Sequence, residues 1–242
     1  MRDKPNSHSR RSFLKGSLVG ISALTVSSQL PILGNPIPQD KTERFFTEPE
    51  DGFLKSAVDR LIPPDERWPG AAEAGVVEYI DQQMAGPWGR GELLYRHGPF
   101  YEGSAAQGYQ FEYTPAELFR RSINAINNRL SAQGTPFAQM SNEDKDTYLA
   151  SLEKGGIDLD GVASNVFFDQ LLDMTVQGFF SDPMYGGNKN MVGWRMIGFP
   201  GAYADYFDLI DKHGVEFKRE PLSIADRNSP SSSLHKMAMR RE

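Results

Sequence analysis

Apolar residues recur at helical spacing along most of this chain, and no convincing run of alternating apolar and polar residues appears. The clearest example places Phe53, Leu54, Ala57 and Val58 one and four positions apart. This spacing is typical of an amphipathic helix, whereas a strand packed on one face would alternate. Pro63 ends the pattern, because proline lacks the backbone donor that a helix needs. The sequence therefore predicts an all-α fold.

Further helices are predicted wherever the same spacing returns. Thr114 and Glu117 form a capping-box pattern, and Pro115 between them is favoured at the first helical position. The most apolar segment, 162–180, is predicted to be the central buried helix. The predicted helices cover residues 49–62, 74–84, 115–133, 141–152, 162–180 and 203–213.

Two long segments do not fit the helical pattern. Residues 86–113 contain six glycines and seven aromatic residues, and residues 181–201 contain five glycines among methionines and aromatic residues. Long connections in compact domains are usually functional or disordered, and these are too aromatic for disorder. We expect a single helical domain over 49–218 with two irregular, glycine- and aromatic-rich loops. A flexible, serine-rich tail is expected over 219–242.

The first 34 residues differ from the rest in charge. They carry five basic side chains against one acidic side chain, a formal charge of +4 within a chain of net charge −6, which leaves −10 for residues 35–242. Within them, Arg10, Arg11, Phe13 and Leu14 match the twin-arginine export pattern. A basic leader ahead of an acidic body is typical of a targeting segment.

This leader is predicted to be a twin-arginine signal peptide over 1–34, followed by a linker over 35–48. The 18 residues 16–33 are uncharged but contain several Ser and Thr, so they are too polar for a typical membrane span. The pattern implies recognition by the twin-arginine translocase and a periplasmic location. Because no A-x-A cleavage site follows, an uncleaved leader that anchors the protein to the membrane stays open as an alternative.

Composition excludes several classes of cofactor site. The chain contains no cysteine, which rules out attached c-type haem, Cys-ligated iron–sulfur clusters, Cys zinc sites and disulfides. Its four histidines include no pair at ligand spacing, so a histidine metal site is not expected. The acidic balance argues against a nucleic-acid partner. We therefore expect this chain to hold no cofactor and no metal of its own.

Few residues qualify as candidates for catalysis or charge recognition. Asp169 and Asp173 lie four positions apart, so their carboxylates would share one helix face and could do acid–base work. The structural interpretation is preferred: they cap, pair with Arg or line the solvated stripe of that helix. His97, in a predicted loop, is either a base or a hydrogen-bonded structural group. Lys189 and Arg195 would contact an acidic partner or form internal ion pairs.

One stretch resembles a known family. Residues 179–201, from Phe179-Phe180-Ser181-Asp182-Pro183 to Gly198-Phe199-Pro200-Gly201, are similar to the signature of the gluconate 2-dehydrogenase subunit 3 family. Shorter pieces agree in the same order, including Leu61-Ile62-Pro63, Gly98-Pro99-Phe100 and Pro115-Ala116-Glu117-Leu118. The resemblance extends to about residue 212 and excludes the serine-rich tail.

The resemblance implies a non-catalytic small subunit of a periplasmic dehydrogenase complex. In that family's complexes, a large flavoprotein of the glucose–methanol–choline type holds FAD and oxidises a sugar, polyol or sugar acid such as gluconate. A multihaem cytochrome c often accepts the electrons. The small subunit would supply the export signal and assist maturation of the flavoprotein. Two alternatives remain: a membrane-tethered scaffold, and a free-standing periplasmic enzyme that uses Asp169, Asp173 or His97.

The glycine- and aromatic-rich loop is the predicted docking surface for the flavoprotein. Trp, Tyr, Phe, Met and Arg are enriched at the centres of interfaces, and glycine lets two backbones approach closely. Trp194 is the expected anchor, although the same aromatic residues could instead pack on this chain's own helices. The predicted interface residues are Met184, Tyr185, Gly186, Gly187, Asn188, Lys189, Met191, Trp194, Arg195, Met196 and Phe199.

Overall fold

A computed structural model describes residues 44–101, 103–104, 109–203, 206–215 and 219–227. All of them belong to one unit of the chain, Lys41–Glu242. The predicted export residues Arg10, Arg11, Phe13 and Leu14 lie outside the described residues. So do most of the predicted linker and residues 228–242 of the predicted tail.

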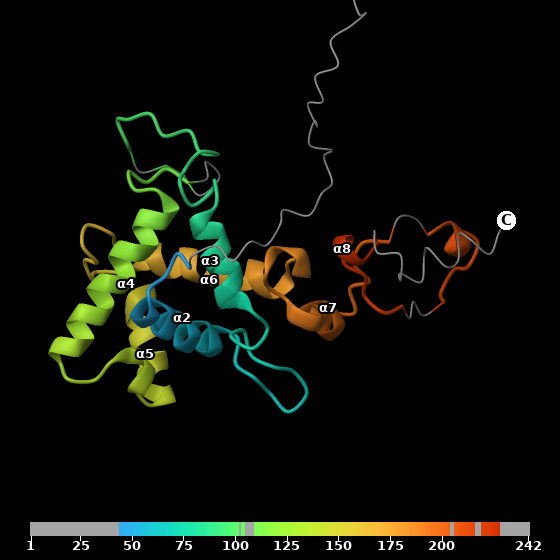
Figure 1. The fold of residues 1–242 in the computed structure, drawn as a ribbon, viewed down its shortest axis with the longest axis horizontal. Helices are drawn as coiled ribbons and strands as arrows, with labels where there is room; N and C mark the ends of the chain where they lie inside the picture. Colours follow the sequence, from blue (N-terminus) through green and yellow to red (C-terminus); the bar gives the residue numbers. More distant parts are fainter. Residues whose placement is uncertain (1–43, 102, 105–108, 204–205, 216–218, 228–242) are drawn as a thin grey trace, which may run out of the picture. The chain divides into compact units, whose positions relative to one another are not determined.

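The described residues form seven α-helices and contain no β-strand, so the all-α prediction is confirmed (Figure 1). None of these helices is long and apolar enough to cross a membrane. The α-helices are α2 (Glu48–Leu61), α3 (Val76–Ala85), α4 (Pro115–Ala132), α5 (Asn142–Glu153), α6 (Ser164–Phe180), α7 (Val192–Ile197) and α8 (Ile224–Arg227). Short 3-10 helices occur at η2 (Phe137–Gln139), η3 (Pro183–Tyr185), η4 (Lys189–Met191) and η5 (Phe207–Leu209).

Capping boxes start two of the longer helices. In α4, the backbone N–H of Glu117 donates to Thr114 Oγ1 over 3.1 Å, and the backbone N–H of Thr114 donates back to Glu117 Oε2 over 2.8 Å. In α2, the backbone N–H of Thr47 donates to Glu50 Oε2 over 2.8 Å. These bonds satisfy N–H groups that have no partner inside the helix, which explains why both helices begin at these residues.

The hydrophobic core is built around α6. This helix contacts α2, α3, α4 and α5, which Figure 1 shows gathered around it. Phe167 of α6 meets Phe119 of α4 edge to face, with ring centroids 5.6 Å apart, and Phe53 of α2 lies 4.9 Å from Phe137. All four rings are almost completely buried, so they join separate helices into one core.

The structure differs from the sequence prediction in three places. Among the described residues of 203–213 there is no α-helix, only the 3-10 helix η5, so that prediction is wrong. The segment 181–201 is not wholly irregular, because it contains η3, η4 and the α-helix α7. The helix α6 is central but not buried all round, since Leu172 and Val176 are 36% and 43% exposed.

Candidate functional site

The segment 181–201 is held against the end of α6 by one buried amide side chain. Asn188 is fully buried, donates through Nδ2 to the Ser181 carbonyl over 2.8 Å, and accepts through Oδ1 from the Gly193 N–H over 2.8 Å. Its backbone is left-handed, with φ of 46°, a conformation that asparagine tolerates better than most residues. A single side chain therefore joins the end of α6 to the start of α7.

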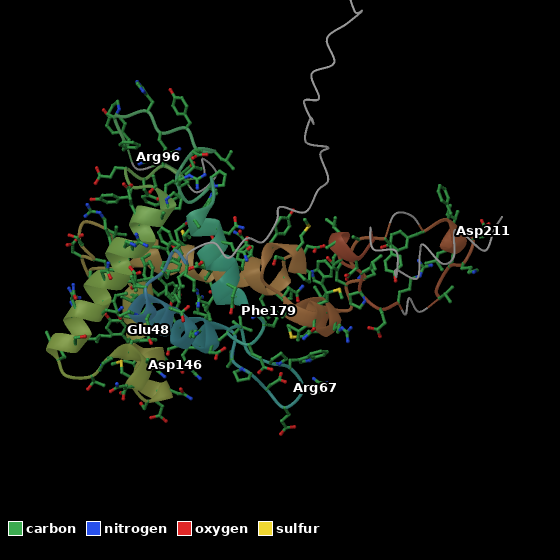
Figure 2. All side chains as sticks on the ribbon, in the orientation of Figure 1. Glu48, Arg67, Arg96, Asp146, Phe179 and Asp211 are labelled. Atoms are coloured by element: carbon green, nitrogen blue, oxygen red, sulfur yellow. The ribbon has the colours of Figure 1, made fainter. Side chains whose placement is uncertain are left out.

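Two glycines bring the segment into direct contact with α6. A Cβ at Gly187 would lie 2.1 Å from the Gly178 carbonyl oxygen, and one at Gly193 would lie 2.2 Å from the Phe179 carbonyl oxygen. Phe179, labelled in Figure 2, lies at the end of α6 beside this segment. Both distances are far below van der Waals contact, so glycine is required at both positions. Gly187 and Gly193 thus serve packing within the chain.

Trp194 packs into its own chain. Only 5% of the residue is exposed, its Nε1–H donates to the Phe180 carbonyl over 2.7 Å, and its ring meets Phe199 edge to face with centroids 5.2 Å apart. Buried tryptophan usually finds such a partner for its N–H. In this structure Trp194 is therefore a core residue, which is the alternative to the predicted role as an interface anchor.

The predicted interface residues divide by exposure. Gly187, Asn188 and Trp194 are buried, and Gly186 and Met191 are half-buried. The residues exposed to solvent are Met184, Tyr185, Lys189, Arg195, Met196 and Phe199. Ile197, which sequence reasoning did not select, is the most exposed large apolar residue of the segment at 59%. The segment thus presents an exposed apolar surface on a buried base, and its contact with a partner stays a prediction.

The two basic residues of the segment form internal ion pairs. Lys189 Nζ lies 3.3 Å from Glu78 Oε1, and Arg195 Nη2 lies 3.3 Å from Glu220 Oε2. All four side chains are largely exposed, so these pairs contribute little to stability. Of the two roles expected for these cations, the structure shows the internal one.

Sequence reasoning did not single out Asp182, which ties the C-terminal residues to this segment. Its carboxylate is almost buried and accepts from the Met184 N–H over 3.0 Å, from Ser223 Oγ over 2.6 Å and from the Ile224 N–H over 2.8 Å. The only local signal was Asp-Pro, which favours a turn or helix start. Residues 222–224 of the predicted tail therefore bond to this segment and its flank, and the short helix α8 (Ile224–Arg227) begins there.

A hollow of about 500 Å³ lies beside this segment. Tyr79 and Gln83 of α3, Val176 and Phe180 of α6, and Tyr185 form most of its wall. Burial raises the pKa of Tyr79, and the neighbouring Tyr185 raises it further. No motif in the sequence marks this hollow, because its walls come from segments about 100 residues apart.

The candidate catalytic residues do not form a recognisable catalytic site. Asp169 and Asp173 lie on the exposed face of α6, and His97 is exposed in the loop after α3, where its ring centroid lies 6.4 Å from that of Tyr95. In the part of the chain that the structure describes, no hydrogen bond or ion pair joins His97 to either aspartate. Among the same residues, no group of three histidine or acidic side chains is placed to hold a metal ion.

Comparison with known proteins matches this architecture to one family. The family described as gluconate 2-dehydrogenase subunit 3 matches residues 48–201, which run from the start of α2 to the end of the segment 181–201. No curated protein and no solved structure matches the chain. The match covers more than half of the chain and includes the signature stretch on which the resemblance rests. The chain therefore belongs to the gluconate 2-dehydrogenase subunit 3 family.

Proposed function

We propose that this chain is the non-catalytic small subunit of an exported, flavin-dependent dehydrogenase complex. The observation that carries the proposal is the family match over residues 48–201, because the family's name is that of a dehydrogenase subunit. The catalytic partner is a flavoprotein of the glucose–methanol–choline type that holds FAD and oxidises a sugar, polyol or sugar acid such as gluconate. A multihaem cytochrome c is the electron acceptor in this proposal.

The surface of the segment 181–201 supports a docking role. Met184, Tyr185, Met196, Ile197 and Phe199 are all between 37% and 59% exposed. Methionine and aromatic residues are favoured at interfaces, and burying their exposed apolar surface against a partner would be favourable. The buried base below them is already fixed by hydrogen bonds and close backbone packing. Binding would therefore cost little conformational entropy, which favours affinity.

The leader supports an export role. Arg10, Arg11, Phe13 and Leu14 match the twin-arginine pattern, and that route carries folded proteins. This chain has no cysteine and no pair of histidines at metal-ligand spacing, so it does not need that route to load a metal cofactor of its own. We propose that it carries a flavoprotein that loads FAD in the cytoplasm, and that it stabilises this subunit during maturation. The complex then works in the periplasm.

Replacing both arginines by lysine tests the export role. Arg10→Lys with Arg11→Lys is expected to hold this chain and its flavoprotein in the cytoplasm, with loss of periplasmic dehydrogenase activity. A matched control is Arg240→Lys with Arg241→Lys, which makes the same two changes at another pair of adjacent arginines, far from the leader in the sequence. Fractionation and activity assays report the outcome. Normal periplasmic activity in the first variant would contradict the proposal.

The purified chain is expected to carry no flavin and no haem. Its absorbance above 350 nm should be flat and it should oxidise no sugar, polyol or sugar acid, whereas the co-purified complex should show a flavin spectrum. Stoichiometric flavin or turnover in the chain alone would instead favour the free-standing enzyme.

N-terminal sequencing of the exported chain distinguishes a cleaved signal from an uncleaved anchor.

A further inference from the structure

The outer face of α6 carries two parallel rows of side chains at i, i+4 spacing. One row is apolar and consists of Leu172, Val176 and Phe180, of which the first two are 36% and 43% exposed. The other row is polar and consists of Asp169, Asp173 and Gln177, all exposed. Residues four apart lie on one face of a helix, so each row follows the helix axis over about 12 Å. The side of α6 that faces solvent therefore carries apolar side chains, although the buried sides of the helix already supply its core contacts.

The apolar row continues into the hollow beside the segment 181–201. Val176 and Phe180 line that hollow together with Tyr185, and the neighbouring Met184 is 37% exposed. The hollow measures about 500 Å³ and is open on one side. An apolar strip therefore runs from Leu172 along α6 to Met184 and Tyr185. We call these five residues the α6 strip.

The polar row beside the α6 strip is negatively charged. Asp169 has a raised pKa because of its partial burial and the nearby carboxylates of Asp173 and Glu153. Among the described residues, no Lys, Arg or His forms an ion pair with any of these three carboxylates. Like charges on adjacent turns destabilise each other, and a cation beside them would relieve that repulsion. The apolar α6 strip is therefore flanked along one side by carboxylates that a cationic partner would stabilise.

We infer that the α6 strip binds a helical segment of the flavoprotein subunit that presents apolar side chains beside a row of Lys or Arg. This inference rests on the proposed function and adds the chemistry of the partner segment. Two helices pack by fitting the i, i+4 rows of one between those of the other, and an amphipathic helix is a common partner for an apolar surface of this kind. The basic row of the partner would lie over Asp169 and Asp173.

The negative charge of the polar row beside the α6 strip argues against two other occupants. In a symmetric dimer the same patch meets itself, and antiparallel packing of two α6 strips would place the acidic rows of the two copies side by side. Such like-charge contacts are costly at an interface. An anionic membrane surface would be repelled for the same reason. A basic segment of a different protein avoids both penalties.

Cross-linking from a single cysteine identifies the occupant. Because the chain contains no cysteine, Val176→Cys introduces a unique thiol on the strip. A photoreactive maleimide on this thiol, applied to the co-purified complex with the flavoprotein, is expected to capture a flavoprotein peptide rich in Lys or Arg. Asn128→Cys, at an exposed position of α4, is the matched control and should capture much less. Capture of a second copy, of this chain's own residues or of an acidic peptide would overturn the inference.

Charge reversal tests the polar row independently. Asp169→Lys with Asp173→Lys is expected to weaken flavoprotein binding about tenfold or more at low salt. We expect the affinity of the wild type to fall as the salt concentration rises, and the affinity of the double variant not to fall. Glu66→Lys with Glu73→Lys changes the net charge equally at exposed sites away from α6, and should change affinity less than threefold. Thermal melts confirm that both variants fold.

The two proposals fail in different ways. If the wild-type chain does not hold the flavoprotein at all, the proposed function is wrong and the inference falls with it. If the wild type binds and the Asp169 and Asp173 double variant binds equally well, the proposed function stands and the inference about the α6 strip is wrong.

Discussion

At the scale of single residues, Trp194 shows how a side chain expected at an interface can serve the core. Trp194→Ala removes a ring that is 5% exposed and leaves the Phe180 carbonyl without its donor. We expect the free energy of unfolding to fall by about 3–5 kcal/mol. Trp194→Phe keeps an aromatic ring but loses the N–H, and should cost about 1–3 kcal/mol. Chemical denaturation measures both.

Partner binding by the folded fraction completes this test. Met196→Ala, at a 39% exposed position two residues away, is the control and should change stability by less than about 0.5 kcal/mol. If Trp194→Ala melts like the wild type but no longer holds the flavoprotein, Trp194 is an interface anchor and the core assignment is incorrect.

At the scale of elements, replacing glycine by alanine is expected to change the free energy of unfolding in opposite directions at two positions. Gly187→Ala forces a methyl group against the Gly178 carbonyl at the end of α6, so we expect a loss of about 1–3 kcal/mol in unfolding free energy. Gly52 lies inside α2 with nothing within 4 Å of a Cβ, so Gly52→Ala should stabilise the protein by about 0.5–1 kcal/mol. Thermal unfolding of both variants provides the measurement, and a shift of the same sign in both would contradict this account.

The helices differ in how far their sequence predicts them. The segments α2 and α4 were predictable because an apolar stripe and a local cap both mark them. In contrast, α7 has only six residues and follows Met191, whose φ is 56°, so no local pattern marks its start. It depends on the amide of Asn188 and on the packing of Trp194. The spacing at 203–213 resembles that of a helix, but the described residues of this stretch form only the 3-10 helix η5.

The sequence predicts which segment forms the candidate site, but not which of its side chains are exposed. Composition singled out 181–201, but which of its side chains face solvent depends on left-handed backbone at Asn188, Asn190 and Met191. Left-handed residues other than glycine are uncommon, and sequence patterns do not locate them well. The exposure of Leu172 and Val176 depends in turn on which faces of α6 the neighbouring helices cover.

At the scale of the whole molecule, acid is expected to destabilise the fold. A bidentate contact with Arg60, with both N–O distances at 2.7 Å, lowers the pKa of Asp146, which Figure 2 labels on α5. Backbone N–H groups likewise lower the pKa of Asp65 and of Glu117. A lowered folded-state pKa contributes stability that is present above the unfolded pKa, near 4, and is lost as pH falls through the folded value.

Two substitutions separate these contributions by sign. Asp146→Asn should lower the melting temperature near neutral pH, and its difference from the wild type should vanish on acidification. Asp169, whose pKa is raised, penalises the folded state when it is ionised. Asp169→Asn should therefore raise the melting temperature near neutral pH, and this gain should also vanish in acid. A difference that stays constant between roughly pH 7 and pH 3 in either variant would refute the linkage.

The hydrogen bonds of the Asp182 carboxylate extend the folded domain beyond residue 201, to Ser223 and Ile224. The family match stops at residue 201, yet two of the three donors to that carboxylate come from Ser223 and Ile224. A chain cut after Gly201 would remove two of these donors together with residues that help to bury the carboxylate, so the turn at Pro183–Tyr185 would lose its contacts with the C-terminal residues. Protease cleavage between residues 201 and 222 would therefore loosen the segment 181–201 from a distance. The boundary drawn by sequence similarity is shorter than the one that this carboxylate requires.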